Sequence, residues 1–232
     1  MENKEEKKEQ LILPRKDKDG NYYISYSQIS KWKRSKRDYI RKYFFGEPDD
    51  NEALQKYGDF GHKVGKSYEN NDFSAWEEGE AEFLKAIPHL DEFEREIKLG
   101  MTGFYVLGYI DTNTKIDDGL AQSYVKELVD YKTGDIEKRT SDYDTDDYYQ
   151  VDIYAAALQQ EFGKYPEKGS VVIIGRSGNA FAGEELKLTK EFKIIDRPIS
   201  KERCEKVLTE VQKITEEISK YYVVYLKITN QL

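Results

Sequence analysis

The sequence predicts a protein of the α/β or α+β class, in which helices cover a mixed central sheet. Three observations lead to this fold class: a helical first third, a middle part of three short apolar segments separated by turn residues, and a last part in which helix and strand patterns alternate. The length of 232 residues suits one domain, or at most two small ones. Architecture by itself identifies no chemistry, so the function has to come from the motifs.

The N-terminal part begins with a charged segment and continues as a helical region. Residues 1–20 have low hydrophobicity and predict a solvated, disordered tail, whereas residues 21–232 are expected to form a single domain. From Ser27 onward, apolar residues recur at spacings of three and four until Gly46 and Pro48, which predicts one helix. Two more helices are expected, over residues 51–70 and 73–87.

The period of the pattern changes after this region. Short segments at residues 93–99, 104–112 and 124–131 alternate or are apolar throughout, with turn residues between them, and predict three consecutive strands. A helix is expected next, at residues 145–162. Three strands that follow a helical region and precede a helix are consistent with a mixed sheet covered by helices.

The last part of the chain adds two extended segments and a long helix. Strands are expected at residues 171–175 and 185–195. The C-terminal helix begins after Ser200, and one stripe of its surface is apolar. The residues of that stripe are Val207, Leu208, Val211, Ile214 and Ile218.

Composition excludes several classes of protein. The 37 basic and 45 acidic residues give a net charge of −8, but 38% of the residues are hydrophobic, which excludes a wholly disordered chain. No hydrophobic run exceeds six residues, against about 18 for a membrane span, and the first ten residues resemble no secretory signal. We therefore expect a cytoplasmic protein. The single cysteine, Cys204, excludes an internal disulfide and a cysteine-ligated iron–sulfur cluster, so any metal is held by oxygen and nitrogen ligands.

Two charges stand at the end of one predicted strand, in Glu127-Leu-Val-Asp130-Tyr-Lys132-Thr-Gly. The period of two puts Asp130 and Lys132 on the same face, although taken alone the segment is an ordinary strand end that enters a turn. A second strand-end carboxylate, Asp111 in Gly108-Tyr-Ile-Asp111, lies one hairpin upstream. Neighbouring strands can bring both carboxylates to one Mg²⁺ or Mn²⁺ ion, and a lysine beside them can orient or deprotonate a water. Phosphodiester hydrolysis needs this combination.

These residues resemble a known family. Gly108-x-x-Asp111 followed by Asp130-Tyr-Lys132 is similar to the second and third motifs of the PD-(D/E)xK nuclease superfamily, in its RecB-like branch. Gly58-x-x-x-His62 upstream and Gln150-x-x-x-Tyr154 downstream stand where RecB-like enzymes carry a histidine and a glutamine–tyrosine pair. The opening Ser25-Tyr-Ser27 also agrees, and the elements follow the order of the family over residues 24–176.

The resemblance implies a restriction-endonuclease-like core and a DNA nuclease with Mg²⁺ or Mn²⁺ as its cofactor. It implies that His62, Asp111 and Asp130 are side-chain metal ligands, that Tyr131 offers its carbonyl, and that Lys132 is the catalytic lysine. For His62 alone, a helix histidine bonded to backbone is the commoner outcome. An iron–sulfur cluster, which many members of the branch bind, is expected to be absent because the cysteines are missing.

The remaining implied site residues lie on a helix and a strand beside these motifs. Gln150 and Tyr154, one helical turn apart and therefore on the same face, are implied to position the lysine or the DNA. Ordinary helix packing is the alternative for this pair. A glutamate on the strand before the second motif, Glu96, is expected close to the site.

A run of basic residues in the first predicted helix suggests a contact with DNA. Trp32, Tyr39 and Tyr43 give this helix an apolar face for the core, so its cations can form a stripe that faces phosphates. A solvated helix face is the alternative. The predicted DNA-binding residues are Lys33, Arg34, Lys36 and Arg37.

Together these patterns favour a metal-dependent deoxyribonuclease, and we expect an exonuclease used in recombination, repair or replication by a bacterium or a phage. Its expected partners are DNA and a helicase or recombination protein. The alternative is a catalytically inactive module with the nuclease fold that binds DNA or a protein. Asp111, Asp130 and Lys132 argue against this alternative, because a binding module has no need of a metal site.

Overall fold

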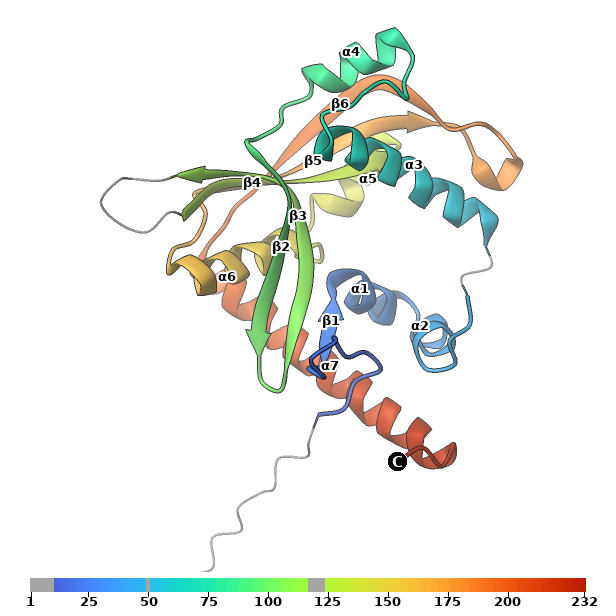
Figure 1. Cartoon of the computed structure of the whole chain (residues 1–232), viewed down its shortest axis with the longest axis vertical. Coiled ribbons are helices and arrows are strands. Elements are labelled where there is room, and N and C mark those ends of the chain that lie inside the picture. The colour runs from blue at the N-terminus through green and yellow to red at the C-terminus, as the bar shows by residue number, and fades with distance from the viewer. Residues whose placement is uncertain (1–10, 49–50, 117–123) are drawn as a thin grey trace, which may run out of the picture. The chain divides into compact units, whose positions relative to one another are not determined.

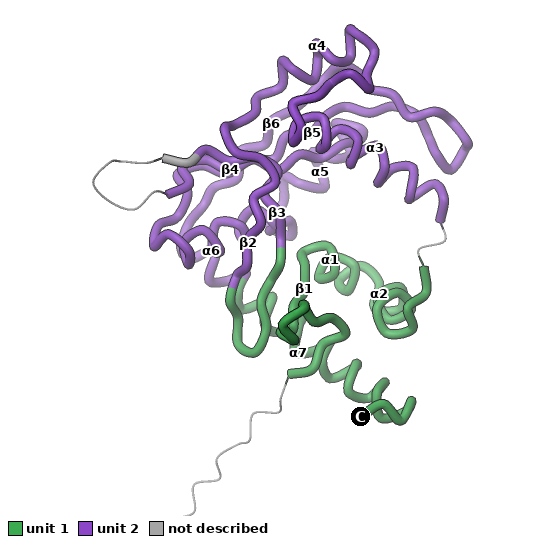
Figure 2. The backbone as a smooth tube through the Cα atoms, in the orientation of Figure 1, with its two compact units in different colours: residues 1–48, 100–107, 208–232 green, residues 49–99, 108–207 purple. Residues whose placement is uncertain are grey.

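The computed structural model of the chain describes residues 11–48, 51–116 and 124–232 (Figure 1). Over these residues it has seven α-helices and a six-stranded mixed sheet, which confirms the predicted fold class. The chain divides into two compact units (Figure 2). Unit 1 consists of residues 1–48, 100–107 and 208–232, and unit 2 consists of residues 49–99 and 108–207. The single domain expected over residues 21–232 stays a prediction.

Unit 2 contains most of the sheet. Its strands are β2 (Glu92–Met101) and β3 (Phe104–Ile116), both of which extend into unit 1, and β4 (Tyr124–Gly134), β5 (Lys168–Ser177) and β6 (Lys187–Arg197). Its helices are α3 (Glu52–Glu69), α4 (Glu78–Ala86), α5 (Ile136–Tyr143), α6 (Gln150–Phe162) and the short 3-10 turn η1 (Ala180–Ala182). Among the described helices, none is long and apolar enough to span a membrane.

The pairing of the strands explains the order of these elements. β3 and β4 are antiparallel, β4 and β5 are parallel, β5 and β6 are antiparallel, and β2 pairs with β3. Parallel neighbours need a crossover connection, which α5 and α6 supply. In the resulting register Asp130 lies beside Val171, and Gly134 lies beside Gly175. The ends of β4 and β5 therefore lie side by side at one edge of the sheet.

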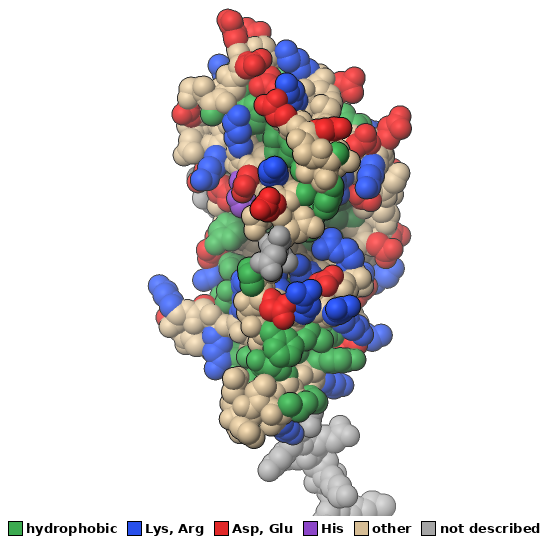
Figure 3. All heavy atoms as spheres, turned by 90° about the vertical axis from the view of Figure 1, so that its right-hand side faces the viewer, with side chains coloured by type: hydrophobic (Ala, Val, Ile, Leu, Met, Phe, Trp, Pro, Cys, Tyr) green, Lys and Arg blue, Asp and Glu red, His purple; other side chains and the backbone are tan. Residues whose placement is uncertain are grey.

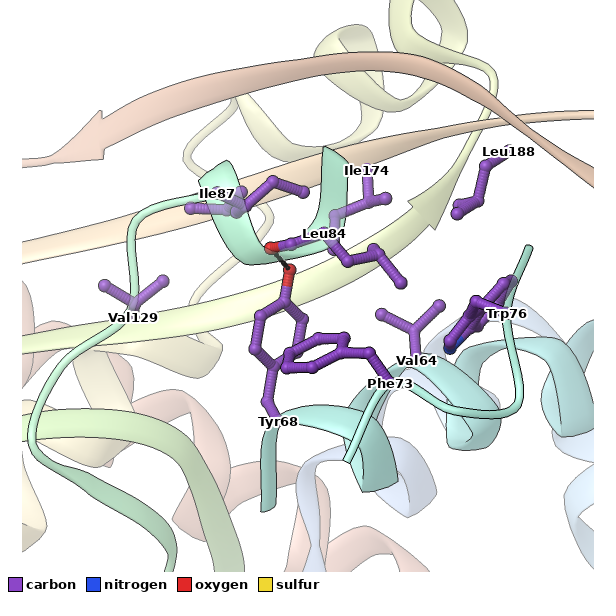
Figure 4. Close-up of a cluster of buried hydrophobic side chains, with 10 residues drawn as sticks. Val64, Tyr68, Phe73, Trp76, Leu84, Ile87, Val129, Ile174 and Leu188 are labelled. Carbon is purple, nitrogen blue, oxygen red and sulfur yellow. Dashed lines mark hydrogen bonds between the residues drawn. The ribbon is translucent and has the colours of Figure 1, made fainter. Parts of the chain in front are cut away.

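One face of β4 and β5 is covered by α3 and α4. Alternate strand residues such as Val129 and Ile174 join a buried apolar cluster with Leu84 of α4 and with Val64 and Tyr68 of α3 (Figure 4). The Tyr68 hydroxyl donates to the Leu84 carbonyl at 2.8 Å. Because successive strand residues face opposite ways, this packing turns the intervening residues toward the other face.

Helix α6 covers that other face (Figure 1). All residues from Val151 to Leu158 are buried, as expected for a helix that is enclosed on every side. At Gly169 of β5 an added Cβ would lie 2.6 Å from Val151, so α6 and β5 approach closely there. Gly163 ends the helix in the left-handed conformation that glycine adopts without strain.

Unit 1 contains β1 (Tyr23–Ser25), α1 (Tyr26–Arg34), α2 (Lys36–Tyr43) and most of α7 (Lys201–Ile228). β1 pairs in parallel with the first residues of β3. The Trp32 ring lies against Tyr39 and Tyr221 with ring centroids 5.1 and 5.3 Å apart, and its indole N–H donates to Glu217 at 2.9 Å. An aromatic core therefore joins α1 and α2 to the C-terminal helix.

The helices differ in detail from the sequence predictions. The helix expected from Ser27 onward is two helices, because the backbone is extended at Ser35, whose hydroxyl accepts the Asp38 N–H at 3.2 Å. The helix expected over residues 73–87 begins only at Glu78. The helix expected over residues 145–162 begins at Gln150. Helix α5 was not expected at all.

The predicted N-terminal tail is partly ordered. Residues 1–10 lie outside the described residues. Within residues 11–20, the Leu13 side chain is buried and the Ile12 N–H donates to the Ser219 hydroxyl at 2.9 Å. The last half of this segment therefore packs in unit 1, because it contains apolar residues that the average over 20 residues conceals.

The apolar cluster of unit 2 gives a first testable prediction. Leu84 is fully buried, whereas Leu54 of α3 is 53% exposed. We expect Leu84→Ala to lower the free energy of unfolding by about 2–5 kcal/mol, because it leaves a cavity, and Leu54→Ala to change it by less than about 0.5 kcal/mol. Urea denaturation followed by circular dichroism measures both. Equal losses would contradict the cluster as the core of unit 2.

Candidate active site

The predicted carboxylates meet where β3 and β4 stop pairing. The last residues that pair across β3 and β4 are Thr112 and Val129, so Asp111 and Asp130 are the next two residues and face the same side. The Tyr131 N–H donates not to a backbone carbonyl of β3 but to Asp111 Oδ2, at 2.6 Å. The Asp111 side chain therefore replaces a backbone hydrogen bond at the point where the strands separate.

Asp130 is 1% exposed, and its two carboxylate oxygens differ in their surroundings. Oδ2 accepts from the Tyr148 hydroxyl at 2.8 Å and lies 2.6 Å from Lys132 Nζ. Oδ1 is buried and has no hydrogen-bond partner among the described residues. A buried charged oxygen without a partner is costly, so this position favours a cation or a donor that binds there.

The charges of the site act strongly on one another. Burial first, and then the neighbouring charge of Asp130, raise the pKa of Asp111 to about 7. Burial alone would lower the pKa of Lys132, but the charges of Asp130 and Asp111 raise it above its ordinary value. Lys132 therefore keeps its proton at neutral pH, which fits orientation and charge stabilisation and does not fit proton abstraction.

The predicted glutamine–tyrosine pair joins this site through a third residue. Gln150 Nε2 donates to the Tyr154 hydroxyl, and Gln150 Oε1 lies 3.3 Å from the Tyr148 hydroxyl, which in turn donates to Asp130. Burial, followed by the charges of Asp130 and Asp111, raises the pKa of Tyr154 well above its ordinary value, so its hydroxyl stays protonated. The pair is thus linked to the buried carboxylate, and its role in positioning lysine or DNA stays a prediction.

Tyr148 is a site residue that the sequence did not reveal. It lies in the turn before α6, next to Tyr149, and both side chains are buried, so burial does not distinguish them. Arg197, at the end of β6, fixes the turn by donating to the carbonyls of Tyr143, Thr145 and Tyr148, each at 2.8 Å. The contact with Asp130 therefore depends on a residue 49 positions later in the chain.

His62 and the strand glutamates are placed differently from the expectation. His62 is exposed on α3 and lies close enough to Glu94 for its charge to oppose the rise that burial causes in the pKa of that carboxyl. Glu94, rather than Glu96, acts on Asp111. The hydroxyl of Tyr109 instead donates to Glu96 at 3.1 Å, and Glu96 pairs with Lys98. Glu94 has a positive φ of 50°, so the regular alternation of side chains along β2 is interrupted there.

No preassembled metal cluster exists in the described part of the chain: nowhere there do three His, Cys, Asp or Glu side chains gather as ligands. The structure brings together Asp111, Asp130 and the backbone of Tyr131, but no direct contact joins His62 to them. The four-ligand metal site therefore stays a prediction.

The basic helix of the sequence analysis is partly neutralised within unit 1. Lys33 lies 2.8 Å from Glu210, and Lys36 lies 2.5 Å from Glu217, both on α7. Arg34 and Arg37 are exposed, but the break at Ser35 places them on different helices. The prediction that these four cations form a stripe on one helix is therefore wrong. DNA binding through these residues stays a prediction. Figure 3 shows acidic and basic side chains interspersed over one face.

The chain was compared with family models, curated proteins and solved structures. No family model matches the chain, and no curated protein matches it. The chain is similar to the solved structure of a "putative exonuclease" from Eubacterium rectale, with 14% sequence identity and a TM-score of 0.49. The match covers 90% of this chain and 82% of that chain. At this degree of similarity, function has to be argued from the site itself.

The raised pKa of Asp111 predicts a pH effect on stability in the absence of metal. Between pH about 4 and about 7 the folded chain holds the Asp111 proton while the unfolded chain releases it, so stability falls as the pH rises. Asp111→Asn retains an oxygen that can accept the Tyr131 N–H, but its amide side chain neither gains nor loses a proton in this pH range. We expect the variant to gain stability relative to wild type across this window, by at most about 1.4 kcal/mol per pH unit. Urea denaturation in EDTA at several pH values measures the difference, and a constant difference would contradict it.

The close packing of Tyr154 on β3 gives another prediction. A Cβ on Gly108 would lie 2.8 Å from Tyr154 Cε1 and 3.3 Å from Ile97 Cδ1. We expect Gly108→Ala to destabilise the protein by about 1–3 kcal/mol, because the ring has to move. Gly58→Ala, on α3 with no atom within 4 Å of the added Cβ, is the control and should stabilise by up to about 1 kcal/mol. Thermal unfolding compares them, and a Gly108 variant as stable as the Gly58 variant would contradict the packing.

Proposed function

We propose that this protein is a metal-dependent nuclease that hydrolyses phosphodiester bonds in DNA. The observation that carries the proposal is Asp130: one oxygen contacts Lys132 and Tyr148, and the other is buried without a hydrogen-bond partner among the described residues. A fixed carboxylate with one vacant oxygen, next to a second carboxylate and a charged lysine, is suited to binding a hard cation and a phosphate together.

The donor set fits Mg²⁺ or Mn²⁺. Asp111 and Asp130 supply carboxylate oxygens, and Tyr131, which lies between Asp130 and Lys132 in the sequence, supplies a backbone carbonyl. The available ligands are therefore hard oxygen donors. His62 is proposed as a further side-chain ligand, because it lies close enough to Glu94 to act on the pKa of that carboxyl, and Glu94 in turn acts on Asp111. When bound, such an ion polarises a phosphate oxygen and lowers the pKa of a water.

The residues of the chain have separate tasks in this proposal. In hydrolysis a water oxygen forms a bond to phosphorus, the bond from phosphorus to one ester oxygen breaks, the water loses a proton to solvent, and the leaving oxygen takes up a proton from solvent. Lys132, which keeps its charge, orients the water and stabilises negative charge on the phosphate. Asp111 and Asp130 would hold the cation beside that phosphate. Tyr148, Gln150 and Tyr154 hold Asp130 in its orientation.

The proposal also includes a family branch and a cellular role for the protein. The order of Gly108-x-x-Asp111, Asp130-Tyr-Lys132 and Gln150-x-x-x-Tyr154 favours the RecB-like branch of the PD-(D/E)xK superfamily, without its iron–sulfur cluster. An exonuclease of recombination, repair or replication, acting with a helicase or recombination protein, is the corresponding role. A module that binds DNA without cutting it is the competing function, and the experiment below distinguishes the two.

The test is cleavage of end-labelled linear and circular DNA with Mg²⁺ or Mn²⁺. We expect Lys132→Ala to lower the rate at least about a hundredfold, because the charge beside the phosphate is lost, while Mn²⁺ binding measured by calorimetry persists. Lys126→Ala, an exposed lysine on the same strand, is the matched control and should act as wild type.

Two outcomes would overturn the proposal. If wild type binds no Mn²⁺, the carboxylates are not a metal site. If wild type binds DNA and Mn²⁺ but cuts neither substrate, the protein is the binding module. Cleavage of linear DNA alone supports an exonuclease, and cleavage of circles supports an endonuclease.

A further inference from the structure

Arg176 is a cation to which the proposed hydrolysis of DNA assigns no role. It lies near the end of β5, with its guanidinium carbon 4.0 Å from the centre of the Tyr57 ring of α3. Its Nε is buried and has no hydrogen-bond partner, and no acidic side chain of the described residues forms an ion pair with it. A partly buried guanidinium held on an aromatic ring, with no carboxylate to neutralise it, is suited to an anion from outside the chain.

A second guanidinium stands near Arg176. Arg139 of α5 lies over Gly134, the residue that pairs with Gly175, and interacts electrostatically with Arg176. Burial first, and to a smaller extent Arg139, lower the pKa of Arg176, while Tyr57 raises it. Arg139 has one ion pair, with Asp142 at 3.1 Å, so the two arginines together retain an excess positive charge.

Two aromatic rings continue this surface. The Tyr57 and Phe181 ring centroids are 5.9 Å apart, and Phe181 is 63% exposed. The turn that presents Phe181 is fixed, because the Tyr57 hydroxyl accepts the Ala180 N–H at 3.0 Å and Asn179 Oδ1 accepts the Phe181 N–H at 3.0 Å. A large ring held rigidly in water is a platform on which a nucleic-acid base can stack.

This surface lies at the edge of the sheet that carries the candidate site. Lys132 pairs with Ile173, so Arg176 is three residues, roughly 10 Å, farther along the neighbouring strand. Gly61 of α3, one turn after Tyr57, lies 3.6 Å from Thr133, measured from an added Cβ. Lys132 faces the α6 side and Arg176 the α3 side, so a ligand that reaches both must bend over the strand ends. A single strand bends in this way more readily than a stiff duplex.

We propose that Arg176, Arg139, Tyr57 and Phe181 bind an unpaired segment of the DNA substrate, with the arginines on its phosphates and Phe181 against a base. The proposal rests on the proposed function for the identity of the substrate. It assigns single-stranded DNA, or a single-stranded end, as the form that enters the site.

The experiment measures binding without hydrolysis. Fluorescence anisotropy in EDTA compares a labelled oligo-dT strand with a hairpin duplex of equal length, using the full chain. We expect wild type to bind the single strand more tightly. Phe181→Ala should weaken single-strand binding about tenfold with an unchanged salt slope, because a stacking partner is lost. Arg176→Gln should weaken it several-fold and reduce the salt slope by about 0.7.

Matched controls are available in unit 2. Phe192→Ala removes another exposed ring, 39% exposed on β6, and Lys201→Gln removes another exposed cation, at the start of α7. Both should bind as wild type, and melting temperatures confirm that all four variants fold. Binding by the Phe181 and Arg176 variants equal to wild type, or a preference of wild type for the duplex, would overturn the inference.

The inference and the proposed function fail independently. If the Phe181 and Arg176 variants lose single-strand binding although wild type never cuts DNA, the surface stands and the nuclease proposal fails. If wild type cuts DNA and these variants bind as wild type, the surface fails and the nuclease proposal stands.

Discussion

The arrangement of unit 2 depends on Asp130, a buried carboxylate that β4 carries among apolar neighbours. An ionised side chain at 1% exposure is tolerable only with charged or hydrogen-bonded partners, and Lys132 and Tyr148 supply them on one oxygen. Tyr148 reaches Asp130 because Arg197 holds its turn. The buried charge therefore constrains a strand, a turn and the end of β6 at once.

The alternation of side chains along β4 places its core residues on one face of the sheet and the charged residues of the candidate site on the other. Val129 and Tyr131 face α3 and α4, where they join or pack against the apolar cluster, and this fixes the strand in register. Asp130 and Lys132 consequently face the other side, where α6 packs. A shift of one residue would place both charges in the apolar cluster, so the core itself determines where the charges lie. The packing of the apolar cluster is therefore sufficient to set the register of β4 at the candidate site.

Much of this could be predicted from the sequence, and the exceptions have physical reasons. The strands β2 to β6 follow from apolar patterns, and the grouping of Asp111, Asp130 and Lys132 follows from the period of a strand. Helix α5 was not predicted because none of its residues is buried, so its sequence has no apolar stripe that would indicate a helix. The break at Ser35 had a signal, since a serine followed by Asp38 three positions later is a capping pattern.

The site residues that escaped prediction depend on long-range structure. Tyr148 is one of 19 tyrosines, and its hydrogen bond to Asp130 arises from a turn that Arg197, 49 positions later, holds in place. Glu94 acts on Asp111 from a backbone conformation that alternation does not anticipate. Both exceptions lie beside Asp111 and Asp130, two carboxylates whose charges repel each other where β3 and β4 stop pairing. A cation would relieve the repulsion between the two carboxylates and would bind the Asp130 oxygen that has no hydrogen-bond partner among the described residues, which is the physical reason for proposing a metal site here.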